Sequence, residues 1–237
     1  MINRLLFLTS TVKPSVIPYW GSVEVRKKEY INAIKFYLAS TSYRIIIVDN
    51  SGYDFNVDFP NEGRLEALSF VETSKNTKGK GYGEVLLMEY GFKHSKFIRE
   101  ADQIVKITGR HIIKNIDKLL AFCNQENAVY VDSTLKIDFA RSYFFVAPKS
   151  FYIANLFLKK ELMNDGDGVY LEHILAQSIK EWMNHGNVYH EFLIPIHIEG
   201  RPGISSVAYQ APNMKRKIAI ASKFYLMEIK KLFVSIW

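Results

Sequence analysis

The chain has 237 residues, 48% apolar and 23% charged, with 13 Gly and 7 Pro, which excludes a fibrous, collagen-like or disordered protein. This length fits one domain, or one domain with an appendage, because single cores stop growing near ~250–300 residues. Of the net charge of +7, six basic residues and one acidic residue lie between Met214 and Trp237, so the body is close to neutral and a nucleic-acid surface over the whole protein is excluded.

No apolar run approaches the ~20 residues that span a bilayer, so we expect no transmembrane helix. Arg4 precedes an apolar run, as in a signal peptide, but Thr9 and the hydroxyl residues after it end that run, and we interpret it as a first buried strand. The single cysteine, Cys123, has no second cysteine or histidine cluster nearby. It predicts a reducing cytoplasm and no structural zinc.

The first half of the chain alternates short apolar runs with amphipathic segments. Strands are predicted over Leu5–Thr9, Ile45–Val48, Leu68–Val71 and Ile104–Thr108, and helices over Glu24–Leu38 and Gly81–His94. Consecutive branched aliphatic residues suit a strand that is covered on both faces. The order predicts an α/β fold with a mainly parallel sheet, whose ligands lie at the carboxyl ends of the strands.

The second half is more mixed. Strands are predicted over Ala128–Asp132, Tyr143–Ala147 and Phe192–His197, and helices over Lys149–Met163 and Val169–Trp182. A boundary signal, Pro212-Asn213, then precedes the basic segment. We therefore expect one domain over 1–211 and a separate helix over 212–237.

The basic segment has the pattern of an amphipathic helix. Its apolar residues recur at steps of three and four, and they are Ile218, Ala221, Tyr225, Ile229, Leu232 and Ile236. Most lysines fall on the flank and the opposite side, which is typical of a helix on an anionic membrane. The alternative is a terminal helix that docks on its own domain.

Polar residues follow the first two predicted strands. Thr9, Ser10 and Thr11 offer hydroxyls and amides that could line a base or ribose, and the Asp49 carboxylate before Asn50 could accept from a base N–H or a ribose hydroxyl. The alternatives are a turn cap and an ordinary Asx turn.

The segment Lys78-Gly79-Lys80-Gly81-Tyr82-Gly83-Glu84 is a candidate diphosphate site. Alternate glycines let a backbone approach a ligand closely, two lysines supply positive charge, and the following helix presents free amides. The segment matches neither a Walker loop nor a dinucleotide fingerprint. A solvated loop is the alternative.

A second candidate phosphate group follows the fourth strand, in Lys106-Ile107-Thr108-Gly109-Arg110-His111. Arginine just past a glycine at a strand's carboxyl end can bind phosphate oxygens with its two-pronged guanidinium. The alternative is a surface arginine after a turn.

These motifs resemble a group of bacterial glycosyltransferases that build capsule and lipopolysaccharide glycans. The resemblance runs from Leu5 to Gly203 and depends mainly on KGKGYGE and KITGR. It implies the GT-A, nucleotide-sugar fold, with Thr9–Thr11 and Asp49 at the nucleoside. It also implies a donor pocket shaped by the glycine loop together with Glu84.

One departure from that group concerns the metal. GT-A enzymes usually carry Asp-x-Asp where this chain reads Thr108-Gly109-Arg110. A divalent ion normally neutralises the leaving diphosphate, and Arg110 with Lys106 or Lys80 is the available substitute. We therefore expect no required cofactor, without excluding Mn²⁺ or Mg²⁺. Asp165-Gly166-Asp167 does occur, as a turn before a late helix or as part of the acceptor site.

An inverting transfer needs a general base on the acceptor hydroxyl. The resemblance implies an acidic residue near the start of a late helix, which Glu172 matches best, with Asp167 as the alternative. A solvated helix carboxylate is the other interpretation of Glu172. Asp132 and Arg141 bracket the central loop and are weaker candidates for the acceptor or the sugar.

The sequence thus predicts transfer of a sugar from a nucleotide-diphosphate sugar to a lipid-linked, lipopolysaccharide or capsule acceptor. The expected location is peripheral, on the inner face of the cytoplasmic membrane. Two alternatives remain, a sugar-phosphate nucleotidyltransferase and a membrane adaptor without catalytic activity. The nucleotidyltransferase expects a glycine-rich loop directly after the first strand, where this chain has Thr9-Ser10-Thr11.

Overall fold

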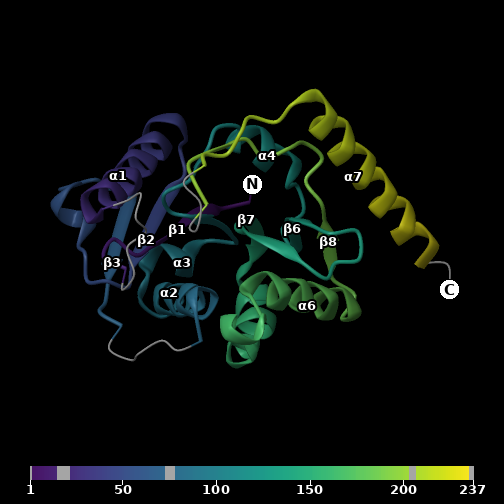
Figure 1. Cartoon of the computed structure of the whole chain (residues 1–237), viewed down its shortest axis with the longest axis horizontal. Coiled ribbons are helices and arrows are strands. Elements are labelled where there is room, and N and C mark those ends of the chain that lie inside the picture. Colours follow the sequence, from purple (N-terminus) through teal and green to yellow (C-terminus); the bar gives the residue numbers. More distant parts are fainter. Residues whose placement is uncertain (1, 15–21, 73–77, 203–206, 235–237) are drawn as a thin grey trace.

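The computed structural model describes residues 2–14, 22–72, 78–202 and 207–234. The central sheet has seven strands in the order β3-β2-β1-β4-β7-β6-β8 (Figure 1). Its strands are β1 (Arg4–Ser10), β2 (Arg44–Asp49), β3 (Leu65–Ser69), β4 (Gln103–Thr108), β6 (Ala128–Ser133), β7 (Ala140–Pro148) and β8 (Val188–His190). All neighbours pair in parallel except at β7, which is antiparallel to both β4 and β6. The α/β, mainly parallel prediction is confirmed.

Helices cover both faces of the sheet (Figure 1). On one face lie α1 (Val23–Ser40) and α4 (Ile116–Phe122), and on the other lie α2 (Lys80–His94), α3 (Lys96–Glu100), α5 (Lys149–Phe151) and α6 (Leu171–Asn184). Helix α7 (Met214–Val234) lies at the periphery and contributes no described residue to either core. Alternate residues of β1 join two separate cores: Leu5 and Phe7 pack with α2 and α6, whereas Leu6 and Leu8 pack with α1 and α4. This two-sided burial explains the unbroken apolar run of the strand.

The topology brings distant segments to one edge. Since β6 and β8 run in the same direction as β1 to β4, the carboxyl ends of six strands lie together, and β7 begins there. Arg141 and Ser142, the second and third residues of β7, therefore lie at this carboxyl edge.

Two elements predicted from the sequence differ from those in the structure. Phe192–His197 is not a strand; β9 (Ile198–Glu199) follows it and pairs with β5 (Ile112–Ile113). The apolar run of the segment imitates a strand, but its backbone bonds to a side chain, with Asn115 donating to the Pro195 carbonyl and accepting from His197 N–H.

The predicted helix Lys149–Met163 is instead a chain of short helical pieces. Residues 149–151 are α-helical, Tyr152–Leu156 forms a π turn and Phe157–Leu162 a 3₁₀ segment. A π turn stacks residues five apart, and the rings of Tyr152 and Phe157 lie 5.9 Å apart between centroids.

The remaining pieces are small. Phe55–Val57 and Asp165–Asp167 are 3₁₀ turns, and the second precedes α6, as one of our interpretations of Asp165-Gly166-Asp167 expected.

Cys123 is buried and free, and burial raises the pKa of its thiol to about 12. Among the described residues, no helix has the length and apolar character needed to cross a bilayer.

Candidate active site at the carboxyl edge

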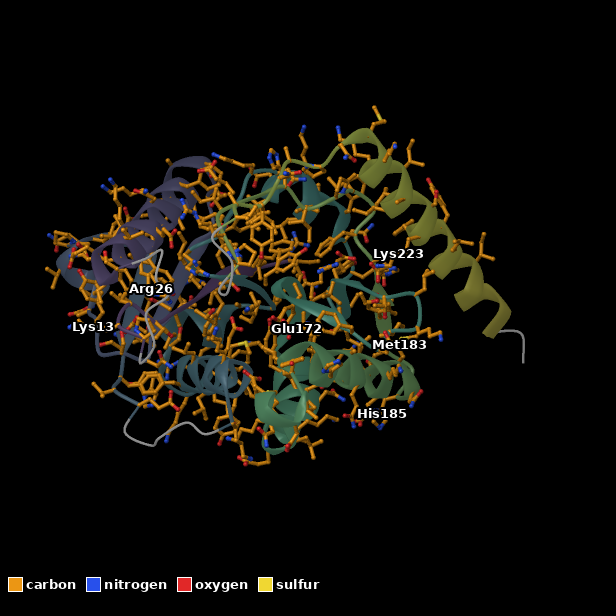
Figure 2. The ribbon with its side chains drawn as sticks, in the orientation of Figure 1. Lys13, Arg26, Glu172, Met183, His185 and Lys223 are labelled. Carbon is orange, nitrogen blue, oxygen red and sulfur yellow. The ribbon has the colours of Figure 1, made fainter. Side chains whose placement is uncertain are left out.

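The candidate donor residues come from three adjacent strands, β2, β1 and β4, and from the start of α2. Side chains from the whole chain are shown in Figure 2, with Glu172 near the middle of the molecule. The edge therefore gathers groups that lie far apart in the sequence.

Asp49 is fully buried and its carboxylate holds two loops together. Oδ2 accepts from Ser10 Oγ at 2.8 Å and Val12 N at 2.9 Å. Oδ1 accepts from the backbone and the hydroxyl of Ser51 and from Tyr53 N. The bond from Ser51 N is the Asx-turn pattern that we left open. In this structure Asp49 fixes the β1 and β2 loops, and a contact with a nucleoside stays a prediction.

The loops after β1 to β3 are joined by a chain of side chains. Thr11 Oγ1 donates to Asn50 Oδ1 at 2.7 Å, and Asn50 Nδ2 donates to Glu72 Oε2 at 3.1 Å. The second oxygen of Glu72 is buried and has no hydrogen-bond partner among the described residues. Sequence reasoning missed Glu72, although a carboxylate directly after a predicted strand was the same signal that singled out Asp49.

Lys106 is fully buried at the end of β4 and is neutralised by α2. Its Nζ lies 2.5 Å from Glu84 Oε1, an atom that also accepts from Thr9 Oγ1 at 2.8 Å. Nζ also donates to the Ser142 carbonyl at 2.6 Å. Removing one partner of a buried ion pair lowers the stability of the fold by about 3–5 kcal/mol, because the other charge stays buried without its partner. Thr9, Glu84 and Lys106 thus meet, as an internal cluster.

Glu172, in the first turn of α6, reaches this cluster through Ser142. Ser142 Oγ donates to Glu172 Oε1 at 2.6 Å. The alternative base, Asp167, lies on the exposed turn before α6, where Asn164 Nδ2 donates to its carboxylate at 2.6 Å. Of the two carboxylates, the structure brings Glu172 to the predicted donor groups.

The glycine loop packs against protein. A Cβ on Gly79, whose φ is +102°, would lie 2.2 Å from Asp165 Cγ, and one on Gly81 would lie 2.9 Å from Leu171 Cβ. Asp165 Oδ2 accepts from Lys80 N at 2.8 Å and so caps α2. The Asp165 carboxylate thus binds the amide at the start of α2, and binding of a diphosphate at this loop stays a prediction. Gly83 is buried within α2.

Gly109 and Arg110 follow β4. A Cβ on Gly109 would lie 2.6 Å from the Thr9 carbonyl, so the glycine lets the chain pass close to β1 after Thr108. The Arg110 side chain is 5% exposed, and its Nη1 lies 3.4 Å from Glu29 Oε2 on α1. Arg110 is therefore a buried cation, not the surface arginine of the alternative interpretation.

His111, beside Arg110, is 3% exposed. Its Nε2 donates to the Arg201 carbonyl at 3.0 Å, because a carbonyl can only accept, and its Nδ1 is buried without a hydrogen-bond partner. Burial lowers the pKa of His111 to about 4, as do the charges of Arg110 and Lys106, although the Arg201 carbonyl and Glu84 act in the opposite direction.

Tyr209 lies over this group, with its ring centroid 5.2 Å from that of His111. Burial raises the pKa of its phenol, Arg110 and Arg141 lower it, and Glu172 raises it, so the phenol lies within electrostatic range of all three. Sequence reasoning assigned no role to His111 or Tyr209. Of the two, only His111 carried a signal, which is its position directly after Arg110.

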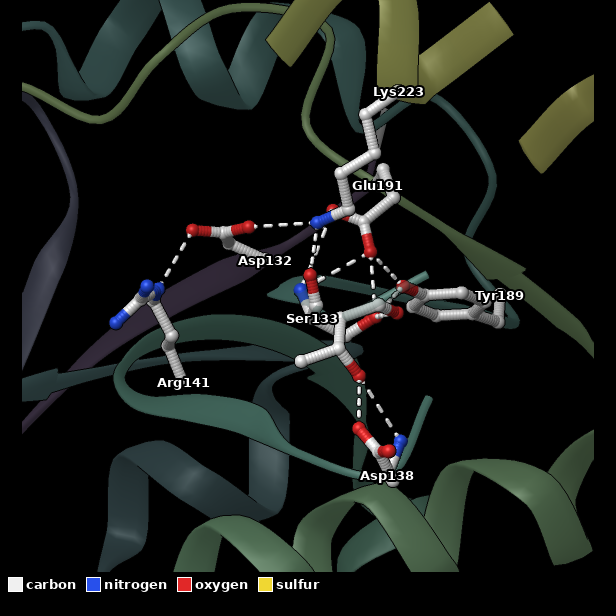
Figure 3. A network of polar contacts seen from close by, with 8 residues as sticks. Asp132, Ser133, Asp138, Arg141, Tyr189, Glu191 and Lys223 are labelled. Carbon is white, nitrogen blue, oxygen red and sulfur yellow. Dashed lines mark hydrogen bonds and ion pairs between the residues drawn. The ribbon is translucent and has the colours of Figure 1, made fainter. Parts of the chain in front are cut away.

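The two weaker candidates form an ion pair at the same edge. Arg141 Nε donates to Asp132 Oδ2 at 3.0 Å (Figure 3). The other oxygen of Asp132 accepts from Lys223 of α7 at 2.9 Å, and Lys223 also pairs with Glu191. Neither Glu191 nor Lys223 had been singled out as a site residue.

Within the described residues, no three His, Cys, Asp or Glu side chains are arranged to hold a metal ion. Metal independence of the reaction stays a prediction, because the lack of such a cluster among the described residues does not test it.

No family model and no curated protein matches the chain. Solved structures resemble it at low identity. HddC from Yersinia pseudotuberculosis is 10% identical with a TM-score of 0.42, covering 62% of this chain and 78% of its own. A protein described as a nucleotide-diphospho-sugar transferase, from Desulfovibrio desulfuricans G20, is 11% identical with a TM-score of 0.47, covering 81% and 80%. A cytidylyltransferase from Leptospira borgpetersenii serovar Hardjo-bovis is 12% identical with a TM-score of 0.46, covering 100% and 97%. Similarity this low assigns neither a family nor an activity to the chain.

Proposed function

We propose that the chain is a glycosyltransferase that uses a nucleotide-diphosphate sugar. One observation carries the proposal: Ser142 accepts from Lys106 through its carbonyl and donates to Glu172 through its hydroxyl. A buried cation and a candidate base thus lie on either side of one residue, at the edge where parallel sheets bind ligands.

In the proposed reaction, Glu172 takes the proton of the acceptor hydroxyl. The acceptor oxygen bonds to the anomeric carbon while the bond from that carbon to the diphosphate oxygen breaks, and a nucleoside diphosphate leaves. Arg110 supplies positive charge to the leaving group, in place of the usual metal ion. Lys106 is paired with Glu84, so its role is to hold the Ser142 backbone beside Glu172.

The proposal extends to the acceptor and the location. A lipid-linked, lipopolysaccharide or capsule glycan follows from the resemblance of KGKGYGE and KITGR. A peripheral position on the inner face of the cytoplasmic membrane follows from the basic helix α7. The charged, apolar-striped helix supports this position.

The test is product analysis. Purified protein is incubated with nucleotide-diphosphate sugars and glycan acceptors, and in parallel with nucleoside triphosphates and sugar 1-phosphates. Sugar transfer or donor hydrolysis supports the proposal. Release of pyrophosphate from a triphosphate would assign nucleotidyl transfer instead. If nucleotides raise the melting temperature but no product forms, the adaptor alternative holds.

Glu172→Gln tests the base within that assay. The amide keeps the shape and the bond from Ser142, but cannot accept the proton, so turnover should fall by roughly 10²–10⁴-fold with unchanged donor affinity. Asp167→Asn is the matched control and should retain turnover. Near-normal turnover of Glu172→Gln would assign the base elsewhere.

A further inference from the structure

Helix α7 lies at the periphery of the molecule (Figure 1), and several of its apolar side chains are exposed. Met214, Ile218, Tyr225 and Ile229 recur at steps of four and seven, so they share one face of the helix. Ile218 and Tyr225 are each 60% exposed, whereas Ile220 is partly buried and lines a small cavity beside Tyr143. Of the stripe predicted from the sequence, Ile218, Tyr225 and Ile229 therefore lie on the outward face, whereas Ala221 is partly buried. Leu232 has no described side chain, and Ile236 lies outside the described residues.

Among the described side chains of the inward face, Lys223 forms ion pairs with the domain. Lys223 Nζ lies 2.9 Å from Asp132 Oδ1 and 2.8 Å from Glu191 Oε2, and it also donates to the Ser133 carbonyl (Figure 3). The Glu191 side chain is 4% exposed and also accepts from Ser133 and Tyr189. A carboxylate this buried needs a neighbouring cation, and Lys223 of α7 neutralises the charge of Glu191.

The same contact adjoins the candidate site. Asp132 uses one oxygen for Lys223 and the other for Arg141, and the next residue, Ser142, donates to Glu172. The helix is thus fixed to the edge where the acceptor would bind.

We propose that α7 docks the carboxyl edge on an anionic lipid bilayer, with the outward face in the lipid and Lys223 as the fixed point on the domain. This deepens the proposed function by naming how its membrane partner is bound, and rests on that function only for the orientation of the acceptor.

Charge favours the bilayer over a second copy of the chain. Six basic residues and one acidic residue lie between positions 214 and 237. Lys215 and Lys217 are exposed beside the apolar face. Anionic headgroups attract such a helix, whereas two copies of it repel each other.

Vesicle flotation tests the outward face. Full-length protein should float with vesicles of phosphatidylcholine and phosphatidylglycerol, not with phosphatidylcholine alone, and salt should weaken the binding. Ile218→Ser with Tyr225→Ser should bind at least about tenfold more weakly. Val57→Ser, another exposed apolar position, is the matched control and should bind as the unaltered protein does.

Two results would overturn this docking. One is full-length protein that does not float, and the other is a double variant that floats as well as the unaltered chain. A dimer in sedimentation that the double variant loses, without vesicle binding, would assign the face to a second copy.

Lys223→Met tests the fixed point. The variant keeps the outward face, so it should still bind vesicles, but chymotrypsin should cleave α7 at Tyr225 or Leu226 several times faster than in the unaltered chain. Lys217 is exposed on the same helix and forms no ion pair among the described residues. Lys217→Met should therefore leave the cleavage rate unchanged, but should weaken vesicle binding about fivefold because one positive charge is lost. Unchanged cleavage of Lys223→Met would exclude the fixed point.

None of these measurements depends on turnover, so the docking can fail while the glycosyltransferase proposal stands, and the reverse.

Discussion

At the scale of single residues, the buried cations of the carboxyl edge lie beside carboxylates. Lys106 pairs with Glu84, and Arg110 approaches Glu29. The sequence predicted that cations would gather at this edge, because strand ends can be located from apolar runs. It could not predict their partners, since Glu29 and Glu84 lie on helices whose rotation about their axes depends on packing.

Arg110→Ala should weaken donor binding. Loss of a charged hydrogen bond costs about 1.5–3 kcal/mol, which is roughly 10- to 150-fold in donor affinity, while EDTA should leave the activity of the unaltered protein nearly intact. Calorimetry with a nucleoside diphosphate measures the first effect. Glu29→Gln, which keeps the arginine, is the control. Strict dependence on added Mn²⁺ would contradict the role of Arg110.

His111 should make the fold sensitive to acid. The unfolded imidazole binds a proton near pH 6.5, but the folded one only near its lowered pKa of about 4. The unfolded state therefore holds more protons between these values, and stability should fall by roughly 3 kcal/mol as the pH falls from about 6.5 to 4. Urea unfolding of His111→Gln beside the unaltered chain measures this. Parallel pH profiles would contradict the prediction.

At the scale of elements, the long strands and amphipathic helices were predictable, and the loops between them were not. The strands at Ile45–Val48 and Ile104–Thr108 and the helix at Gly81–His94 are confirmed, with small shifts at their ends. The third strand lies at Leu65–Ser69, three residues earlier than predicted. Phe192–His197 misled because a short apolar run can pack on the core without pairing with a neighbouring strand.

The glycine loop shows the same limit. Its glycines allow a close approach, and the group that approaches Gly79 in the structure is Asp165, about 85 residues later in the sequence, while the predicted ligand contact stays a prediction. Spacing along a chain does not show which segment folds back onto it.

Gly79→Ala should therefore destabilise the fold. The added Cβ would overlap Asp165 and the positive φ would be strained, a cost of about 1–3 kcal/mol. Asp165→Ala alone should cost about 0.5–2 kcal/mol as a lost helix cap. In the double variant the two costs should not add, because the overlap is gone.

Thermal or urea unfolding of the three variants completes the cycle. Gly63→Ala is the control, since it has nothing within 4 Å of its Cβ, and it should be close to neutral. Full additivity of the two costs would contradict the contact between the loop and the turn.

At the scale of the whole molecule, the chain has a two-sided core, and helix α7 meets the domain through Lys223 and the partly buried Ile220. The sequence predicted the boundary at Pro212-Asn213 and the stripe of α7, but not the buried Glu191 that Lys223 neutralises. A terminal helix that packed its predicted apolar stripe on the domain would have buried Ile218 and Tyr225, but both side chains are exposed.

A chain that ends at Asn213 should lose binding to anionic vesicles and activity on lipid acceptors, with donor binding retained. Its melting temperature should fall by only a few degrees, because Asp132 and Glu191 lose their cation but little apolar surface is uncovered. Flotation, calorimetry and melting curves measure the three effects. Loss of donor binding together with a large fall in melting temperature would favour a helix that is part of the core.

The buried thiol of Cys123 has a practical consequence. It is the single cysteine of the chain, and with a pKa of about 12 it carries almost no thiolate at neutral pH. A cysteine introduced at Ser222 of α7 or at Asp138 of the hairpin between β6 and β7 would be the reactive thiol, with the native residue left in place. Spin labels or fluorescent dyes at such sites can report the depth of each position in a bilayer, so the natural sequence already serves as a background for site-specific labelling.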